Sequence, residues 1–205
     1  KPIQYATAEV GRAADTFRYA AETLRSATGE LLNLDLRPGL EQRLGLVRRF
    51  PVGPVLCISP FNFPLNLVAH KLAPCLMAGN AIVLKPASTT PRSALLLGEM
   101  LVQAGWPAPA ISVVPAPGRL MDPLVQDPRF RAVSFTGSGD VGWRIKTIAG
   151  QKKVILELGG DAAAIVLADA NLPAAARACA HGAFAYAGQV CISVQRIIVE
   201  AAVYQ

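Results

Sequence analysis

Short apolar runs and longer helix-like segments alternate along the chain from residue 55 onwards, and this alternation restricts the fold more than any other feature. The apolar runs are rich in Val, Ile and Leu and lie at 55–58, 81–84, 111–114, 132–135, 154–156, 164–167 and 196–200. The helix-like segments lie at about 64–79, 92–104, 121–126, from about 141 onwards, and at 171–187. This order predicts an α/β fold with a mostly parallel sheet that helices cover on both faces. Ligands of such sheets bind at the carboxyl ends of the strands.

A helix and a pair of extended segments are expected before this alternating region. Apolar residues recur at three- and four-residue steps from Val10 to Leu24, which predicts an amphipathic helix over about 5–28. Gly29 is a plausible end for this helix. The following residues are more polar, and Arg37-Pro38-Gly39 suggests a turn between two extended segments.

The charge pattern and the composition argue against nucleic-acid, membrane and metal-binding functions. The formal net charge is +6, but the basic residues are scattered and form no patch with interleaved aromatic side chains. The uncharged stretch 50–69 contains four prolines, which a membrane-spanning helix does not tolerate. The four cysteines form no CxxC pair, and the two histidines complete no metal-ligand spacing, so no metal site is expected. No signal peptide opens the sequence, so we expect a cytoplasmic protein with reduced thiols.

Three segments that directly follow predicted strands could bind a ligand. In the segment from Gly137 to Gly142, glycines allow the backbone to approach a phosphate and the helix start attracts anions, although an ordinary structural turn fits equally well. Lys85 could hold ribose hydroxyls or a 2′-phosphate, or it could be a solvated lysine at the end of a strand. The side-chain amide of Asn62 could donate to an oxyanion, or Asn62 could be a turn residue between prolines. The positive net charge agrees with an anionic ligand such as a nucleotide.

Cys191 and Glu157 are candidates for covalent chemistry. A thiolate can add to a carbonyl carbon, and a nearby carboxylate can activate the water that later hydrolyses the intermediate. Cys191 lies in a polar turn, between Gly188-Gln189 and Ser193, although an inert core thiol is the alternative. Glu157 lies between two leucines, where a carboxylate is paired, at a strand end, or functional, and burial would favour a general base.

Taken together and in this order, the motifs resemble those of the aldehyde dehydrogenase superfamily of NAD(P)-dependent, non-phosphorylating enzymes. The matching segments are Phe50-Pro51-Val52-Gly53-Pro54, Pro60-Phe61-Asn62-Phe63-Pro64, Lys85-Pro86-Ala87, Phe135-Thr136-Gly137-Ser138, Glu157-Leu158-Gly159-Gly160 and Gly188-Gln189-Val190-Cys191, followed by Arg196. The resemblance covers nearly the whole chain, and the last two segments are highly specific. It implies a Rossmann-like, mostly parallel sheet with helices on both faces, a protruding hairpin arm and the beginning of a second α/β domain.

The resemblance also implies a role for each candidate residue. Cys191 would be the nucleophile and Glu157 the general base, while Asn62 and the backbone N–H of Cys191 would form the oxyanion hole. Lys85 would hold the adenosine ribose, and Ser138 would hold the pyrophosphate. The other cofactor-binding residues expected are Ser59, Pro60, Phe61, Ser88, Gly118, Phe135, Gly137, Leu158 and Gly159. The implied reaction oxidises an aldehyde to a carboxylic acid with NAD(P)⁺, through a thiohemiacetal and then a thioester that Glu157-activated water hydrolyses.

Ser88 departs from the pattern of the NAD-preferring members of this family. They often carry a glutamate three residues after the lysine, and its carboxylate bonds the ribose hydroxyls and repels a 2′-phosphate. A serine removes that repulsion. We therefore expect NADP to be tolerated or preferred over NAD.

The resemblance divides the chain into an NAD(P)-binding domain (1–33 and 50–158), an oligomerisation arm (34–49) and the start of a catalytic domain (159–205). Family members are more than twice as long, and the Glu-x-Phe-Gly-Pro segment that holds the nicotinamide ribose does not occur here. We therefore expect an internal fragment that is inactive alone. The full-length protein would be a homo-oligomer, a dimer or a tetramer, although 34–49 could be an ordinary surface hairpin. The alternative function is a catalytically dead cofactor-binding or interaction module.

Overall fold

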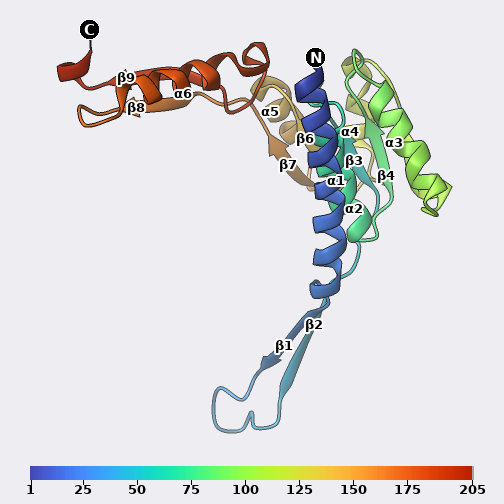
Figure 1. Cartoon of the computed structure of the whole chain (residues 1–205). Coiled ribbons are helices and arrows are strands. Elements are labelled where there is room, and N and C mark those ends of the chain that lie inside the picture. The colour runs from blue at the N-terminus through green and yellow to red at the C-terminus, as the bar shows by residue number, and fades with distance from the viewer. Residues whose placement is uncertain (205) are drawn as a thin grey trace.

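The computed structural model describes residues 1–204, and these form the α/β fold expected from the sequence. A hairpin and a C-terminal unit extend from a central sheet in different directions (Figure 1). The central strands are β3 (Val55–Ile58), β4 (Ile82–Lys85), β5 (Ile111–Val113), β6 (Ala132–Thr136) and β7 (Lys153–Glu157). They pair in the order β5-β4-β3-β6-β7, and every neighbouring pair is parallel. The order reverses between β3 and β6, and ligands of such sheets bind at this point.

The central sheet separates two apolar cores. Because successive strand residues point to opposite faces, Val55 and Cys57 of β3 join one core while Leu56 and Ile58 join the other. The first core includes side chains of α2 (Asn66–Met77) and α3 (Arg92–Gln103), and the second includes side chains of α4 (Asp122–Gln126) and α5 (Gly139–Ile148). Burial on both faces explains why the strands read as continuous apolar runs.

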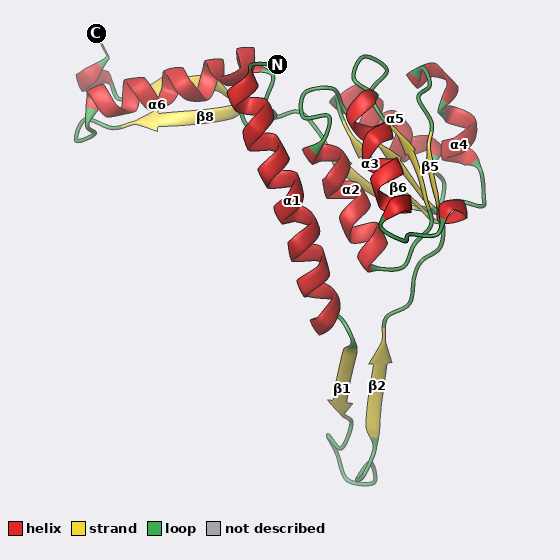
Figure 2. Cartoon of the chain, turned by 45° about the vertical axis from the view of Figure 1, so that its right-hand side comes forward, coloured by secondary structure: helices red, strands yellow, loops and turns green. Residues whose placement is uncertain are grey.

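The first helix, α1 (Ile3–Ser26), packs along α2 on the outside of the first core (Figure 2). Ala13 is buried on its inner side, and Phe17 packs against the first core. The sequence predicted this helix to within two residues at each end, because its apolar stripe has the helical period.

The hairpin begins earlier than the boundary at residue 34 that the sequence suggested. Its antiparallel strands are β1 (Gly29–Asn33) and β2 (Leu44–Arg48), and Leu31 pairs with Leu46. Gly29 starts β1 with a φ of +134°, and a Cβ there would lie 2.1 Å from the carbonyl oxygen of Val47. Gly29 therefore ends the helical segment and also permits the first strand pair, so the extended arm spans 29–48.

The C-terminal unit contains two parallel strands and one helix. They are β8 (Ala162–Val166), α6 (Leu172–Phe184) and β9 (Val194–Val199). The Asn171 side chain caps α6 and accepts a hydrogen bond from Ala174 N at 3.1 Å. The helix was predicted to reach residue 187, but it ends at Phe184 because Tyr186 and Ala187 adopt positive φ angles. Gln205, the last residue of the predicted domain 159–205, lies outside the described residues.

Short 3-10 helices join these elements, at Ala108–Ala110, Gly118–Leu120, Ala185–Gly188 and Ala201–Val203. Within residues 1–204, no helix combines the length and the apolar character needed to span a membrane.

Candidate active site

The loops that follow the central strands are tied together at the carboxyl edge of the sheet. Ser59, directly after β3, donates its N–H to the carbonyl of Lys85 at 3.1 Å. The hydroxyl of Ser88 donates to the carbonyl of Ala116 at 3.1 Å, which links the loops after β4 and β5. Gly137, after β6, donates its N–H to the carbonyl of Glu157 at 3.0 Å. The predicted ligand loops therefore share one edge of the sheet.

The glycine-rich turn after β6 is shaped by the ring of Phe135. A Cβ on Gly137 would lie 2.5 Å from that ring, and a Cβ on Gly142 would lie 2.4 Å from the Leu158 side chain. The Phe135 ring is itself only 5% exposed and belongs to the second core. The side chains of Phe135 and half-buried Leu158 therefore pack against this turn, and both residues stay predicted cofactor neighbours.

The start of α5 offers a site for an anion. Ser138 occupies the N-cap position with extended dihedral angles, but its hydroxyl makes no capping hydrogen bond within the described chain. The first backbone N–H groups of a helix are free of intrahelical partners, and they attract negative charge. This supports Ser138 and Gly137 as phosphate neighbours.

Lys85 and Ser59 form a second polar feature at the ends of adjacent strands. Lys85 is 7% exposed, forms no ion pair with residues 1–204, and has a pKa that burial lowers. The hydroxyl of Ser59 is buried without a hydrogen-bond partner in the described part of the chain. Burying a cation or an unpaired hydroxyl costs free energy unless a bound ligand supplies the hydrogen-bond partners that it lacks. Both residues fit the ribose and phosphate groups of a dinucleotide.

The remaining cofactor-binding candidates lie around this edge. Pro60 is half-buried, whereas Phe61, Ser88, Gly118 and Gly159 are exposed. Each follows a strand, so the expected positions lie on the loops at the sheet edge and not in the core.

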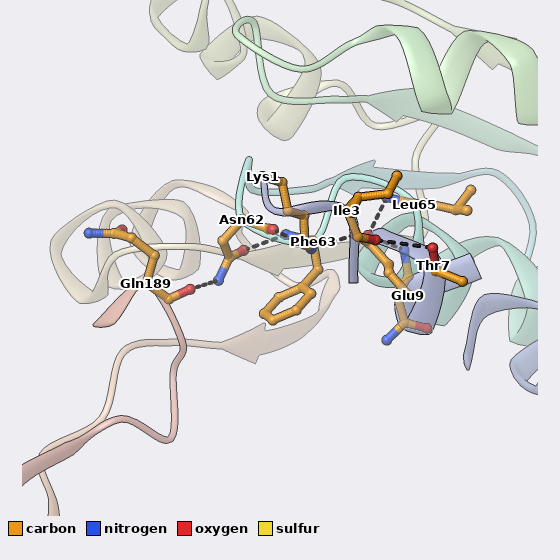
Figure 3. Close-up of polar contacts among 9 residues, drawn as sticks. Lys1, Ile3, Thr7, Glu9, Asn62, Phe63, Leu65 and Gln189 are labelled. Atoms are coloured by element: carbon orange, nitrogen blue, oxygen red, sulfur yellow. Dashed lines mark hydrogen bonds and ion pairs between the residues drawn. The ribbon is translucent and has the colours of Figure 1, made fainter. Parts of the chain in front are cut away.

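The loop of Cys191 is held against the loop of Asn62. One N–H of the Asn62 side-chain amide donates to the carbonyl of Gln189 at 2.9 Å, and Asn62 Oδ1 accepts from Phe63 N at 3.1 Å (Figure 3). Cys191 is exposed and its thiol is free. The second N–H of the Asn62 amide has no hydrogen-bond partner within residues 1–204.

The segment after Glu157 also reaches the Cys191 loop. A Cβ on Gly160 would lie 2.7 Å from the carbonyl oxygen of Cys191, so the backbone of Gly160 packs directly on the nucleophile loop. Two signature segments that are separate in sequence therefore meet in space.

Glu157 is exposed at the end of β7 and lacks the burial that would favour a general base. The physical reason is the position of β7 at the edge of the central sheet, where Ile155 is also 57% exposed. Glu157 ends β7, and its backbone joins the glycine-rich turn.

Lys71 is a further candidate site residue that the sequence motifs did not include. Its ammonium lies under β6, where it donates to Ser134 Oγ at 3.1 Å and to Thr136 Oγ1 at 2.8 Å. Burial lowers the pKa of Lys71 to about 8, and the charge of Glu157 acts in the opposite direction. A lysine at a core-facing position of the otherwise apolar helix α2 was the signal that could have revealed it.

The pKa of the neighbouring residue His70 is influenced by its burial and by several charges. Burial is the main cause that lowers the pKa of His70, and the charges of Arg12 and Lys71 lower it further, whereas Glu157 raises it. The charges that influence the pKa of His70 thus come from α1, α2 and β7.

Comparisons with known proteins agree with the motifs and the geometry. The model of the aldehyde dehydrogenase family matches residues 1–205. Aspartate-semialdehyde dehydrogenase 1 of Pseudomonas canavaninivorans is 42% identical over 205 residues, covering 100% of this chain and 44% of that protein. The 3-sulfolactaldehyde dehydrogenase of Priestia aryabhattai is 44% identical over 205 residues, covering 100% of this chain and 43% of that protein.

A solved structure shows the same fold. The NADP-dependent glyceraldehyde-3-phosphate dehydrogenase from Bacillus halodurans C-125, complexed with NADP, has a TM-score of 0.94 and 42% identity, covering 99% of this chain and 43% of that chain. The chain thus spans less than half the length of these relatives. On the matched family model and the identity along its whole length, this chain belongs to the aldehyde dehydrogenase family.

Proposed function

We propose that the chain carries the cofactor-binding part and the nucleophile of an enzyme that oxidises an aldehyde to a carboxylic acid with NAD(P)⁺. The observation that carries this proposal is the contact of two separate segments with the Cys191 loop. The Asn62 amide binds the carbonyl of Gln189, and the backbone of Gly160 packs on the carbonyl of Cys191. A nucleophile, an oxyanion donor and the segment of the proposed base thus converge.

Cys191 acts as the nucleophile in the first step. Its thiolate attacks the carbonyl carbon of the aldehyde and forms a thiohemiacetal, whose oxygen carries the developing negative charge. The free N–H of the Asn62 amide and the backbone N–H of Cys191 donate to that oxygen. Because the Asn62 amide is already held by the Gln189 carbonyl, little reorganisation is needed when the charge develops.

The cofactor residues fit a dinucleotide. Lys85 and the Ser59 hydroxyl supply a buried cation and an unpaired donor for the ribose, and Ser138 with the start of α5 supplies N–H groups for the pyrophosphate. Bound NAD(P)⁺ supplies an acceptor for the hydride of the thiohemiacetal carbon. The Ser88 hydroxyl is bonded to a backbone carbonyl and carries no charge, which supports NADP as the tolerated or preferred cofactor.

Glu157 acts after the oxidation. It accepts a proton from the water that attacks the Cys191 thioester, and this attack releases the carboxylic acid and the thiol. Lys71 is buried and donates to Thr136, the residue before the glycine-rich turn.

The names of three relatives support an aldehyde that also carries an acidic group. The three relatives described above act, by name, on aspartate semialdehyde, 3-sulfolactaldehyde and glyceraldehyde 3-phosphate, and each of these compounds carries an acidic group. A short anionic aldehyde is therefore the substrate class that we propose.

The assembly of the full enzyme belongs to the same proposal. The arm formed by β1 and β2 protrudes from the molecule and exposes apolar side chains, which suits pairing with another copy in a homodimer or homotetramer. Alone, the chain is expected to bind cofactor and to expose the nucleophile without sustaining turnover. The second candidate, a catalytically dead cofactor-binding module, is favoured only by the exposure of Glu157 and Cys191.

The acylation of Cys191 separates these two functions. With p-nitrophenyl acetate, the Cys191 thiolate forms a C–S bond to the acetyl carbon and p-nitrophenolate leaves, so an oxyanion forms without any cofactor. We expect acetyl-Cys191, identified by peptide mass spectrometry, and a rate about 10²-fold lower in Asn62→Ala. Equal rates for the wild type and Asn62→Ala would contradict the catalytic proposal and favour the module.

A further inference from the structure

Three segments of the chain meet around the side chain of Lys1. They are the start of α1, the loop that carries Asn62 and Phe63, and the turn that leads to Cys191 (Figure 3). Lys1 and Glu9 have no role in the proposed mechanism.

Glu9 connects α1 to the start of α2. Its carboxylate is buried, with 5% of the residue exposed, and its Oε1 accepts from Leu65 N at 2.8 Å and from Asn66 N at 2.9 Å. The N-cap residue of α2 provides no side-chain cap of its own. Glu9 therefore satisfies the free N–H groups of α2 from a different helix, and its negative charge suits the positive end of the helix dipole.

The second carboxylate oxygen of Glu9 holds Lys1. Lys1 Nζ lies 2.5 Å from Glu9 Oε2 and donates to the carbonyl of Asn62 at 3.0 Å. The side chain of Lys1 is only 12% exposed, although the residue is charged. The ammonium therefore bridges a capping carboxylate and the backbone of the proposed oxyanion residue.

The same ammonium also contacts the turn before the nucleophile. Lys1 Nζ lies 3.9 Å from the centroid of the Phe63 ring and 4.7 Å from the centroid of the Tyr186 ring. The two rings are 5.7 Å apart, and cation–π contacts of this kind are attractive. Tyr186 and the next residue Ala187 adopt the strained left-handed region, with φ of 51° and 55°, so this turn needs such support.

We propose that Lys1 and Glu9 are positioning residues that fix the Asn62 loop against the Cys191 loop, and that they thereby set how well the oxyanion is stabilised. The inference rests on the proposed function of Asn62. Both ends of the hydrogen bond from Asn62 to Gln189 are anchored by Lys1, one through the Asn62 carbonyl and the other through the Tyr186 ring. An oxyanion donor must be held within about 0.5 Å of its productive position, so loss of either anchor weakens it.

The test compares two reactions of Cys191 in the same protein. Acetylation by p-nitrophenyl acetate passes through an oxyanion, whereas alkylation by iodoacetamide is a direct displacement that forms none. The ratio of the two rates therefore reports oxyanion stabilisation and cancels changes in thiol access or ionisation. Both rates are read for the Cys191 peptide by mass spectrometry, because Cys75 is also partly exposed.

We expect the ratio to fall about tenfold in Lys1→Gln and in Glu9→Gln, with the alkylation rate within about twofold of the wild type. Glu9→Gln keeps an amide oxygen for the N–H groups of α2 and removes only the charge that holds Lys1. The ratio of the two rates in the double variant should be no lower than in either single variant, because the two residues act as one unit. Lys1→Arg should restore most of the ratio, and Glu22→Gln, an exposed carboxylate on the same helix, should leave it unchanged.

Three results would overturn the inference, and they are distinguishable. A normal ratio in Lys1→Gln and Glu9→Gln, with a reduced ratio in Asn62→Ala, would remove the positioning role and leave the proposed function intact. A normal ratio in Asn62→Ala as well would show that the oxyanion role itself is wrong. Parallel changes in both rates, at an unchanged ratio, would show that Lys1 and Glu9 only stabilise the fold.

Discussion

At the scale of single residues, the contact between Gly160 and Cys191 most strongly constrains the site. The segment 157–160 begins at the last residue of β7, whereas Cys191 follows α6. Their backbones can touch only because glycine at position 160 has no side chain. A carbonyl oxygen of the main chain cannot move aside as the end of a flexible side chain can. The position therefore tolerates no larger residue.

Gly160→Ala tests this contact. The new Cβ would lie 2.7 Å from the Cys191 carbonyl oxygen, so we expect a loss of about 1–3 kcal/mol in the free energy of unfolding and slower acetylation of Cys191. Gly159→Ala is the matched control, because a Cβ on Gly159 has no atom within 4 Å. Urea unfolding measures the first effect, and equal stability of the two variants would count against the contact.

The buried ammonium of Lys71 predicts a pH dependence. Its pKa is about 8 in the folded chain, below its ordinary value of 10.5, because burial disfavours the charged form. Between these two values the unfolded chain holds a proton that the folded chain has lost, so stability rises with pH. Relative to Lys71→Met, the free energy of unfolding should rise by up to about 1.4 kcal/mol per pH unit from pH 8 to 10.5.

Chemical denaturation at several pH values, in the wild type and in Lys71→Met, measures that difference. A difference that stays flat above pH 8, or that falls, would show that the Lys71 ammonium is not buried as described.

At the scale of elements, the sequence predicted the strands and helices whose formation depends on local residue patterns. The central strands and the helix α1 were placed closely, because apolar runs and helical periodicity are local signals. The end of α6 was placed three residues too late, because the positive φ angles of Tyr186 and Ala187 depend on tertiary contacts around the Cys191 loop. Within the site, the family motifs singled out Cys191, but periodicity and composition alone could not show that Glu157 lies exposed on an edge strand or which β6 side chains the Lys71 ammonium bonds.

The cap of α6 leads to a prediction about the local stability of this helix. Asn171→Ala removes the acceptor of Ala174 N and should cost about 1 kcal/mol of local helix stability. Hydrogen exchange of the Ala174 amide should then be about fivefold faster, since 1 kcal/mol changes an equilibrium by roughly that factor. Asn171→Asp keeps an acceptor and should exchange at nearly the wild-type rate. Unchanged exchange in the alanine variant would contradict the cap.

At the scale of the whole molecule, the hairpin arm protrudes as a two-stranded ribbon with exposed apolar side chains. Within residues 1–204, the two strands of the arm pair only with each other. The side chains of Leu31, Leu36, Leu44 and Leu46 are between 64% and 84% exposed. An exposed ribbon of this kind pairs readily with another chain. The protruding arm thus agrees with the homo-oligomer that we propose for the complete enzyme.

We therefore expect this chain to self-associate through the arm. Leu31→Lys combined with Leu46→Lys changes a directly paired apolar couple and should shift the molar mass measured by light scattering towards that of a monomer. Leu96→Lys, on an exposed face of α3, is the control and should have little effect. A wild-type chain that runs as a monomer at high concentration would contradict the role of the arm.

The central claim is that Asn62 and Cys191 share one acyl-transfer site, and the side-chain amide signals of Asn62 test it most directly. In a ¹⁵N-labelled chain, acetylation of Cys191 should place a carbonyl oxygen near the free N–H of Asn62 and shift its signals, while the signals of more distant asparagines stay in place. Cys191→Ser treated in the same way should show no shift. If the Asn62 signals do not move when Cys191 is fully acetylated, the two residues do not form one site.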